Sequence, residues 1–424
     1  MKKPDEHDSA EPVPLPAEAK SPSIEDRIRE VGSQLRVTIG AVLAKLPGAP
    51  HRPNQLAKLL NCNRAVASRV LSGTSKSDPL EVAHIIPGPE PLRRLLNVAI
   101  EEGVALELIS PATLAVDHFD VLIRDEAGTR TALDSLISST LPGARERFEL
   151  SNKYSVYKGM SQLKGAQAEL WVGAAIIAPS HEQPLKHDLT WLNGAVAMQR
   201  LRRNVTIQFS YRYRSDSETS DPDPEQLKDS STQAAFGVIP LDQFCVNPPA
   251  RLEARSAGKA IHYTLPDDLL GPKQAVDMFV VDHHPAAMNR YAKPAERHRN
   301  SLFIEPAMPV ANLMFDTILH EDVFPGSEPQ LYLYDTGYNG IANVNDPERD
   351  IDRVDIHENV EFLGHDLGRF HATELPNYGQ MLMHLANRFD WDPARFRAYR
   401  IRIQYPVYGW QVSLSFEPPP KPTD

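Results

Sequence analysis

The stretch at residues 54–73, NQLAKLLNCNRAVASRVLSG, most constrains how this 424-residue chain can fold. Two short segments with helical spacing of apolar residues lie on either side of a small polar hinge, Asn61, Cys62 and Asn63. Pro53 fits the first turn of a helix, and Asn63 is a favoured N-cap for the next one. The stretch therefore predicts two short helices joined by a tight turn.

The residue types in this stretch are those that two closely crossing helices require. A small residue, Ala57, lets the second helix approach the first. Four residues later, Asn61 tolerates the left-handed backbone conformation of a turn better than most residues other than Gly. The second helix also has an apolar face that can point inward, formed by Val66, Ala67, Val70 and Leu71.

On these residues, LAKLLNCNRAVASRVLSG resembles the helix-turn-helix of lac-repressor-type and phage-lambda-repressor-type regulators. The pattern of those families is an Ala, a turn Gly four residues later, and a recognition helix that ends in Ser-Arg-Val-Leu or similar. Ala57 matches the Ala, residues 68–71 match the Ser-Arg segment, and Asn61 stands where Gly is usual. The resemblance implies that Arg64 and Ala65 face base edges in the major groove. It also implies that Asn63, Ser68 and Arg69 lie near phosphates or base edges.

The charge distribution favours DNA contact by this part of the chain alone. The whole chain has a formal charge of −11, yet residues 31–77 contain no Asp or Glu and seven Lys or Arg residues, so the remainder carries −18. Phosphate neutralisation requires cationic side chains without neighbouring carboxylates. A local cationic field in an acidic molecule attracts a polyanion at one face only.

Periodicity and composition predict a multidomain chain with an all-α N-terminal domain and a large mixed α/β region. Residues 1–22 are rich in Pro, Ala and charge and should be a disordered tail. Ser23 and Asp26 resemble a capping box that begins a long helix, and Gly103 ends a later one. These signals define a helical helix-turn-helix domain at 23–104. Beyond it we expect an α/β lobe at 105–214, a polar linker or loop at 215–233, a strand-rich α/β lobe at 234–416 and a disordered tail at 417–424.

One stretch resembles a catalytic motif. Asp282, His283 and His284 end a predicted strand, as in the DHH phosphoesterases, which bind two metal ions. Those enzymes also need an earlier aspartate pair at a strand end, whereas the upstream Asp221 and Asp223 lie in the polar loop. The histidines at 357, 365 and 371 match no zinc template. We therefore expect no catalytic residues, no metal site and no cofactor.

The sequence predicts a cytoplasmic, sequence-specific DNA-binding transcriptional regulator that does not enter the membrane. Two Cys residues are too few for a disulfide framework, and no apolar run approaches the length of a membrane span. The expected partners are double-stranded DNA, a second copy in a homodimer, and a small-molecule effector sensed by the C-terminal region. Two alternatives stay open: an enzyme of unknown chemistry, with metal-dependent hydrolysis as its leading form, and an interaction protein whose helix-turn-helix docks onto protein.

Overall fold

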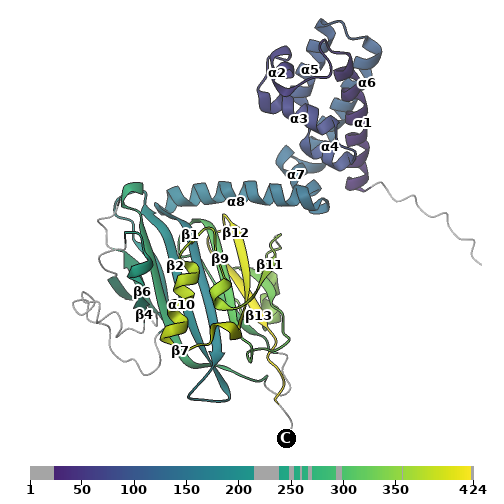
Figure 1. Ribbon diagram of the computed structural model, residues 1–424. Helices are drawn as coiled ribbons and strands as arrows, with labels where there is room; N and C mark the ends of the chain where they lie inside the picture. The colour runs from purple at the N-terminus through teal and green to yellow at the C-terminus, as the bar shows by residue number, and fades with distance from the viewer. Residues whose placement is uncertain are drawn as a thin grey trace, which may run out of the picture. The chain divides into compact units, whose positions relative to one another are not determined.

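The computed structural model describes residues 23–213, 238–247, 253–257, 260–265, 270–292, 298–355 and 357–421. The chain forms two compact units, Met1–Phe148 and Glu149–Asp424. The first is helical and the second is built on β-sheets (Figure 1). An N-terminal all-α region followed by a large mixed α/β region is therefore confirmed. The predicted tail at 1–22, the linker at 215–233 and residues 422–424 lie outside the described residues.

The helical unit begins with a long helix, α1, whose ends follow local signals. Ser23 and Asp26 form the predicted capping box, in which the Asp26 N–H donates to Ser23 Oγ at 3.2 Å. Gly32 lies where the chain crosses α1: a Cβ at this position would stand 2.0 Å from the carbonyl oxygen of Pro79. The helices of this unit are α1 (Ile24–Lys45), α2 (Pro53–Leu59), α3 (Arg64–Thr74), α4 (Pro79–Ile85), α5 (Pro89–Glu101), α6 (Leu106–Val121), the π-helix η1 (Leu122–Ala127) and α7 (Arg130–Thr140).

The helical unit extends past the predicted boundary at residue 104. Helix α6 buries Ile109, Val116 and Phe119 in the same core as α1 and α5. Because these side chains complete a core that begins at α1, residues 106–140 belong with the helices and not with the predicted lobe at 105–214. The next helix, α8 (Pro142–Lys164), runs across the division between the two units.

The second unit contains one large sheet and two small ones. The large sheet has seven strands in the order β11-β12-β9-β1-β2-β7-β4, and the small sheets have the orders β10-β13-β8 and β3-β6-β5. The strands are β1 (Ala166–Pro179), β2 (Lys186–Arg200), β3 (Ile207–Tyr213), β4 (Val238–Pro240), β5 (Glu253–Ala257), β6 (Ala260–Leu265), β7 (Val276–Asn289), β8 (Asn300–Ile304), β9 (Val310–His320), β10 (Gln330–Asp335), β11 (Val360–His365), β12 (Phe396–Gln404) and β13 (Trp410–Phe416).

The strand pairing does not follow the predicted division into lobes at 105–214 and 234–416. Strand β1 pairs in parallel with β9, and β2 pairs antiparallel with β7. Strands from both predicted lobes thus satisfy each other's backbone hydrogen bonds in the middle of one sheet, so the two segments cannot be separate lobes. The predicted tail at 417–424 is also held at its start, where the Glu417 N–H donates to Ser327 Oγ at 2.9 Å.

Both faces of the large sheet are covered. On β1, Trp171, Ala175 and Ile177 contribute to one core, and the alternating residues contribute to another that includes helix α10 (Tyr378–Arg388). A continuous run of buried residues on β1 is what such a two-sided environment requires. This arrangement leaves room on the first face for the cavity described below.

Candidate nucleic-acid interface

Helices α2 and α3 are joined by the tight turn that the sequence predicts. Pro53 is the first residue of α2. Asn61 adopts a left-handed conformation with φ of 42°, which reverses the chain after the helix. The Cys62 N–H then donates to the carbonyl oxygen of Ala57 at 3.0 Å and satisfies a terminal carbonyl of α2.

Helix α3 begins at the predicted N-cap. Asn63 Oδ1 accepts a hydrogen bond from the Ala65 N–H at 2.7 Å. The inner face of the helix buries Ala67, Val70 and Gly73. A Cβ on Gly73 would lie 3.2 Å from the Cα of Ile86, so the helix packs closely on the residue that follows α4. These contacts fix which side of α3 faces outward.

All five predicted DNA-contacting residues have exposed side chains, and so does Ser72. Positions 64, 65, 68, 69 and 72 recur at helical spacing, so the structure brings these side chains onto one outward face of α3. This face contains no carboxylate. The predicted residues are Asn63, Arg64, Ala65, Ser68 and Arg69.

Arg69 differs from the other four because it also braces the unit. Its Nε donates to Ile85 O at 2.9 Å and its Nη2 donates to Ile86 O at 3.3 Å. The Nη2 of Arg130, on α7, donates to the two preceding carbonyl oxygens of α4 at 2.8 and 2.7 Å. A cation at the C-terminus of a helix satisfies its free carbonyls and interacts favourably with its dipole. No local sequence pattern predicts this contact. It depends on how the turn after α3 places the C-terminal end of α4 beside Arg69.

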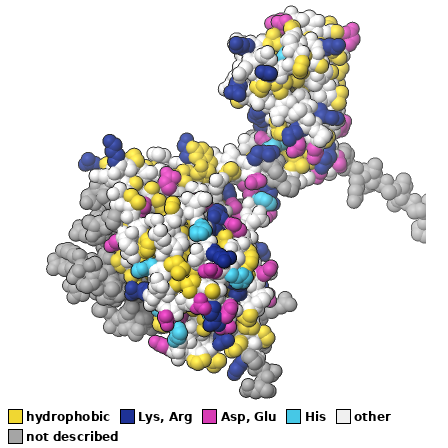
Figure 2. All heavy atoms as spheres, in the orientation of Figure 1, with side chains coloured by type: hydrophobic (Ala, Val, Ile, Leu, Met, Phe, Trp, Pro, Cys, Tyr) yellow, Lys and Arg dark blue, Asp and Glu magenta, His cyan; other side chains and the backbone are white. Residues whose placement is uncertain are grey.

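The cations near α2 and α3 are available to a polyanion. No described carboxylate lies within ion-pair distance of Arg52, Lys58 or Arg64, whereas Lys76 pairs with Glu81 at 3.3 Å. Figure 2 shows Lys and Arg side chains over α2 with no Asp or Glu between them in that view. Five acidic residues of this unit pair with other cations: Glu25 and Asp78 with Arg29, Glu126 with Arg27, and Asp117 and Asp120 with Arg93.

Comparisons with protein-family models, curated proteins and solved structures found no match to this chain. Of the helices within the described residues, none combines the length and the apolar character that a bilayer crossing requires.

The stretch that resembles a metal site does not converge on one point. His283 Nδ1 lies 2.8 Å from Thr190 Oγ1. The His283 ring stacks on the Phe389 ring, with 4.6 Å between the ring centroids. Burial lowers the pKa of His283. Asp282 and His284 are on the opposite face of β7, where their side chains lie 3.0 Å apart. Across the described part of the chain, no group of three His, Cys, Asp or Glu side chains could hold a metal ion.

The histidines at 357, 365 and 371 lie among acidic residues that have other partners. Glu358 pairs with Lys153, and Glu361 pairs with Arg402 at 2.6 Å. Asp366 Oδ1 accepts from the Gly368 N–H at 3.0 Å and caps a short 3-10 turn. Each of these three carboxylates therefore has a hydrogen-bond or ion-pair partner within the protein.

Proposed function

We propose that this protein is a sequence-specific DNA-binding transcriptional regulator in which α2 and α3 act as a helix-turn-helix. The observation that carries the proposal is the outward face of α3, which is exposed, free of carboxylates and flanked by cations without ion-pair partners among the described residues. A helix held in this way can enter the major groove with its N-terminal residues first.

The proposed contacts follow from the position of each side chain. Arg64 is the first residue of α3, where a guanidinium can donate two hydrogen bonds to one guanine. Ala65 beside it leaves space for a base edge or a thymine methyl. Asn63 and Ser68 can donate to phosphate oxygens. Arg52 and Lys58, at the start and end of α2, are suited to phosphates on the flanking backbone.

A single module of this kind buries little surface, so we propose that two copies bind together. Dimeric helix-turn-helix proteins place two recognition helices about 34–36 Å apart, one turn of the duplex. The bound sequence should accordingly contain two related half-sites with that spacing. Light scattering of the protein, alone and with DNA, measures whether a dimer forms.

The test begins with selection of bound sequences from a randomised DNA pool, followed by titration of variants. Arg64→Ala should weaken the selected site by about 1–3 kcal/mol and scrambled DNA much less, because it removes base discrimination. Lys58→Ala should weaken both duplexes alike and lower the salt slope by about one. Arg94→Ala is the matched control, since Arg94 is an exposed arginine on α5 that pairs with Glu90.

Arg69→Ala requires a stability measurement beside the binding titration. Loss of its bonds to Ile85 and Ile86 should lower the stability of the helical unit by about 1–2 kcal/mol, which Arg64→Ala should not do. A pool that yields no preferred sequence, together with unchanged DNA affinity in Arg64→Ala and Lys58→Ala, would refute the proposal. A protein captured through the same face would then support the docking alternative.

A further inference from the structure

The sheet unit contains a cavity of about 580 Å³ that the proposed DNA contacts do not use. It is lined by residues on one face of β1, β2 and β7 (its floor), by residues of β3 and β6, and by residues at the ends of β8, β10 and β13 (its rim). The volume is within the range of small-molecule sites, which is about 300–1,000 Å³. Six aromatic side chains line it: Trp171, Trp191, Phe209, Tyr263, Phe303 and Tyr408.

The register of the large sheet places an indole beside a carboxylate on the floor. Trp191 on β2 is directly opposite Asp282 on β7, and side chains at paired positions lie on the same face. Two residues further along β2, Asn193 lies on the same face as Trp191 and is paired with Gly173 on β1. A Cβ on Gly173 would lie 2.4 Å from Ile304 Cδ1, so the glycine lets β8 approach the floor.

The aromatic walls are held in place by neighbouring rings. Trp191 stacks on Phe315, with ring centroids 6.0 Å apart and an interplanar angle of 15°. The ring centroids of Trp171 and Phe209 lie 5.9 Å apart. Since Phe315 and Phe209 are both buried, the two indoles have little freedom to move. A ligand in the cavity would therefore contact aromatic surfaces that are already in position before it binds.

A second carboxylate is fixed at the rim. Thr336 Oγ1 lies 2.8 Å from Glu305 Oε1 and 2.6 Å from Gly409 O, so its single proton is shared between these two acceptors, and the Thr336 N–H donates to Gly409 O at 3.1 Å. These residues follow β8 and β10 and precede β13, so three strand ends meet at this point. The carboxylate of Glu305 is thereby oriented without a cationic partner among the described residues.

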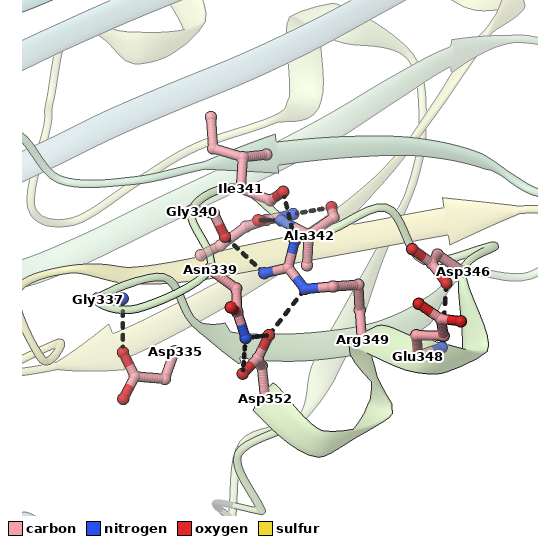
Figure 3. Close-up of polar contacts among 11 residues, drawn as sticks. Asp335, Gly337, Asn339, Gly340, Ile341, Ala342, Asp346, Glu348, Arg349 and Asp352 are labelled. Carbon is pink, nitrogen blue, oxygen red and sulfur yellow. Dashed lines mark hydrogen bonds and ion pairs between the residues drawn. The ribbon is translucent and has the colours of Figure 1, made fainter.

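The loop that begins at Thr336 is braced along its length (Figure 3). Arg349 donates to Asp352 Oδ2 at 2.7 Å, to Gly340 O at 2.6 Å and to Ile341 O at 2.9 Å. The buried Gln411 on β13 exchanges hydrogen bonds with the backbone of Ala342 at 2.7 and 3.0 Å. These bonds hold the loop that follows Thr336 against the small sheet.

The charges of the residues that line the cavity favour a positively charged ligand over a negatively charged one. Among its described residues are two carboxylates, Asp282 and Glu305, and no Lys or Arg; its one histidine is His284, whose Nε2 lies 3.0 Å from Asp282 Oδ2. Aromatic faces attract a cation through their quadrupoles, and the attraction grows as water is excluded. The same carboxylates repel an anion. We propose that this cavity binds a small organic cation, an amine or quaternary ammonium group with a compact apolar or aromatic body.

This site stands apart from DNA binding, and its test does not require a DNA sequence. Calorimetric titration of the full chain would compare three probes with the same phenylbutyl body: 4-phenylbutylamine as the cation, 4-phenylbutanol as the neutral form and 4-phenylbutyrate as the anion. The amine should bind about tenfold more tightly than the alcohol, and the anion should bind more weakly than either.

Two substitutions connect that preference to the cavity. Asp282→Asn and Glu305→Gln should each reduce the affinity for the amine about fivefold and leave the affinity for the alcohol unchanged. Glu321→Gln is the control, since Glu321 is an exposed acid of the same unit that pairs with Arg395. Equal affinity for all three probes, no binding of the amine, or an amine affinity that neither substitution changes would overturn the proposal.

Discussion

The helical unit and the sheet unit place their charged groups in opposite ways. Around α2 and α3, Arg64 and its neighbours are exposed and without described carboxylate partners. In the sheet unit, Arg400 and Asp316 form a fully buried ion pair at 2.6 Å, and the Tyr378 hydroxyl donates to the same carboxylate at 2.6 Å. Burial of Tyr378 beside that carboxylate raises its pKa well above the usual value.

This difference separates charge used for recognition from charge used for structure. Exposed, unpaired cations can contact a polyanion without first breaking an ion pair, and neutralisation of its phosphates releases condensed counterions. A buried ion pair is different, because removal of either partner leaves a buried charge without its counter-charge and lowers the stability of the fold. Three experiments test this difference, and each is expected to change one unit only.

The largest effect is expected from Asp316→Asn. The substitution leaves the guanidinium of Arg400 buried without its counter-charge, which typically costs about 3–5 kcal/mol. The sheet unit should unfold at lower denaturant concentration while the helical unit keeps its midpoint. Asp322→Asn is the control, since Asp322 forms an exposed pair with Arg395. A single transition that shifts as a whole would show that the two units do not unfold separately.

A smaller effect is expected from Gly32→Ala in the helical unit. The added methyl would meet the Pro79 carbonyl oxygen, so α1 and α4 must move apart at a cost of about 2–3 kcal/mol. Gly40→Ala in the same helix meets nothing within 4 Å and should stabilise the unit by up to about 1 kcal/mol. Thermal unfolding followed by helical circular dichroism measures both. Equal shifts in the two variants would contradict the close crossing of these helices.

The third prediction concerns acid. His187 is fully buried, and burial lowers its pKa from 6.5 to about 4, with Arg290 and His320 acting in the same direction and Asp188 and Asp322 opposing them. The unfolded chain therefore takes up a proton at higher pH than the folded chain does. Stability from this residue is present above pH 6.5 and is lost as the pH falls towards 4, by about 2 kcal/mol at pH 5.

Urea titrations at pH 8 and pH 5 would measure this loss in the sheet unit. His187→Leu should make the stability of that unit less sensitive to acid, whereas His181→Leu, at an exposed position, should not change the sensitivity. An unchanged difference between the two pH values in His187→Leu would show that other groups cause the acid sensitivity.

The local features of the helical unit could be predicted from neighbouring residues in the sequence. The capping box of α1, the proline that begins α2, the left-handed Asn61 and the N-cap Asn63 were all predicted correctly. Each of these signals acts over a few residues, so the residues that produce it stand next to one another in the chain. For the same reason, the outward positions on α3 could be selected before any packing was known.

Other features depend on contacts between segments that are distant in the chain and could not be predicted in this way. Helix α6, which contains Pro111, was assigned to the wrong unit. The pairing of β1 with β9, the bracing of α4 by Arg69 and the meeting of Asp282 with Glu305 at one cavity join residues that are distant in the chain. The spacing of apolar residues indicates that one face of a strand or helix is buried, but it does not indicate which other segment packs on that face. That choice depends on the complementarity of whole surfaces, which is expressed only when the chain has folded.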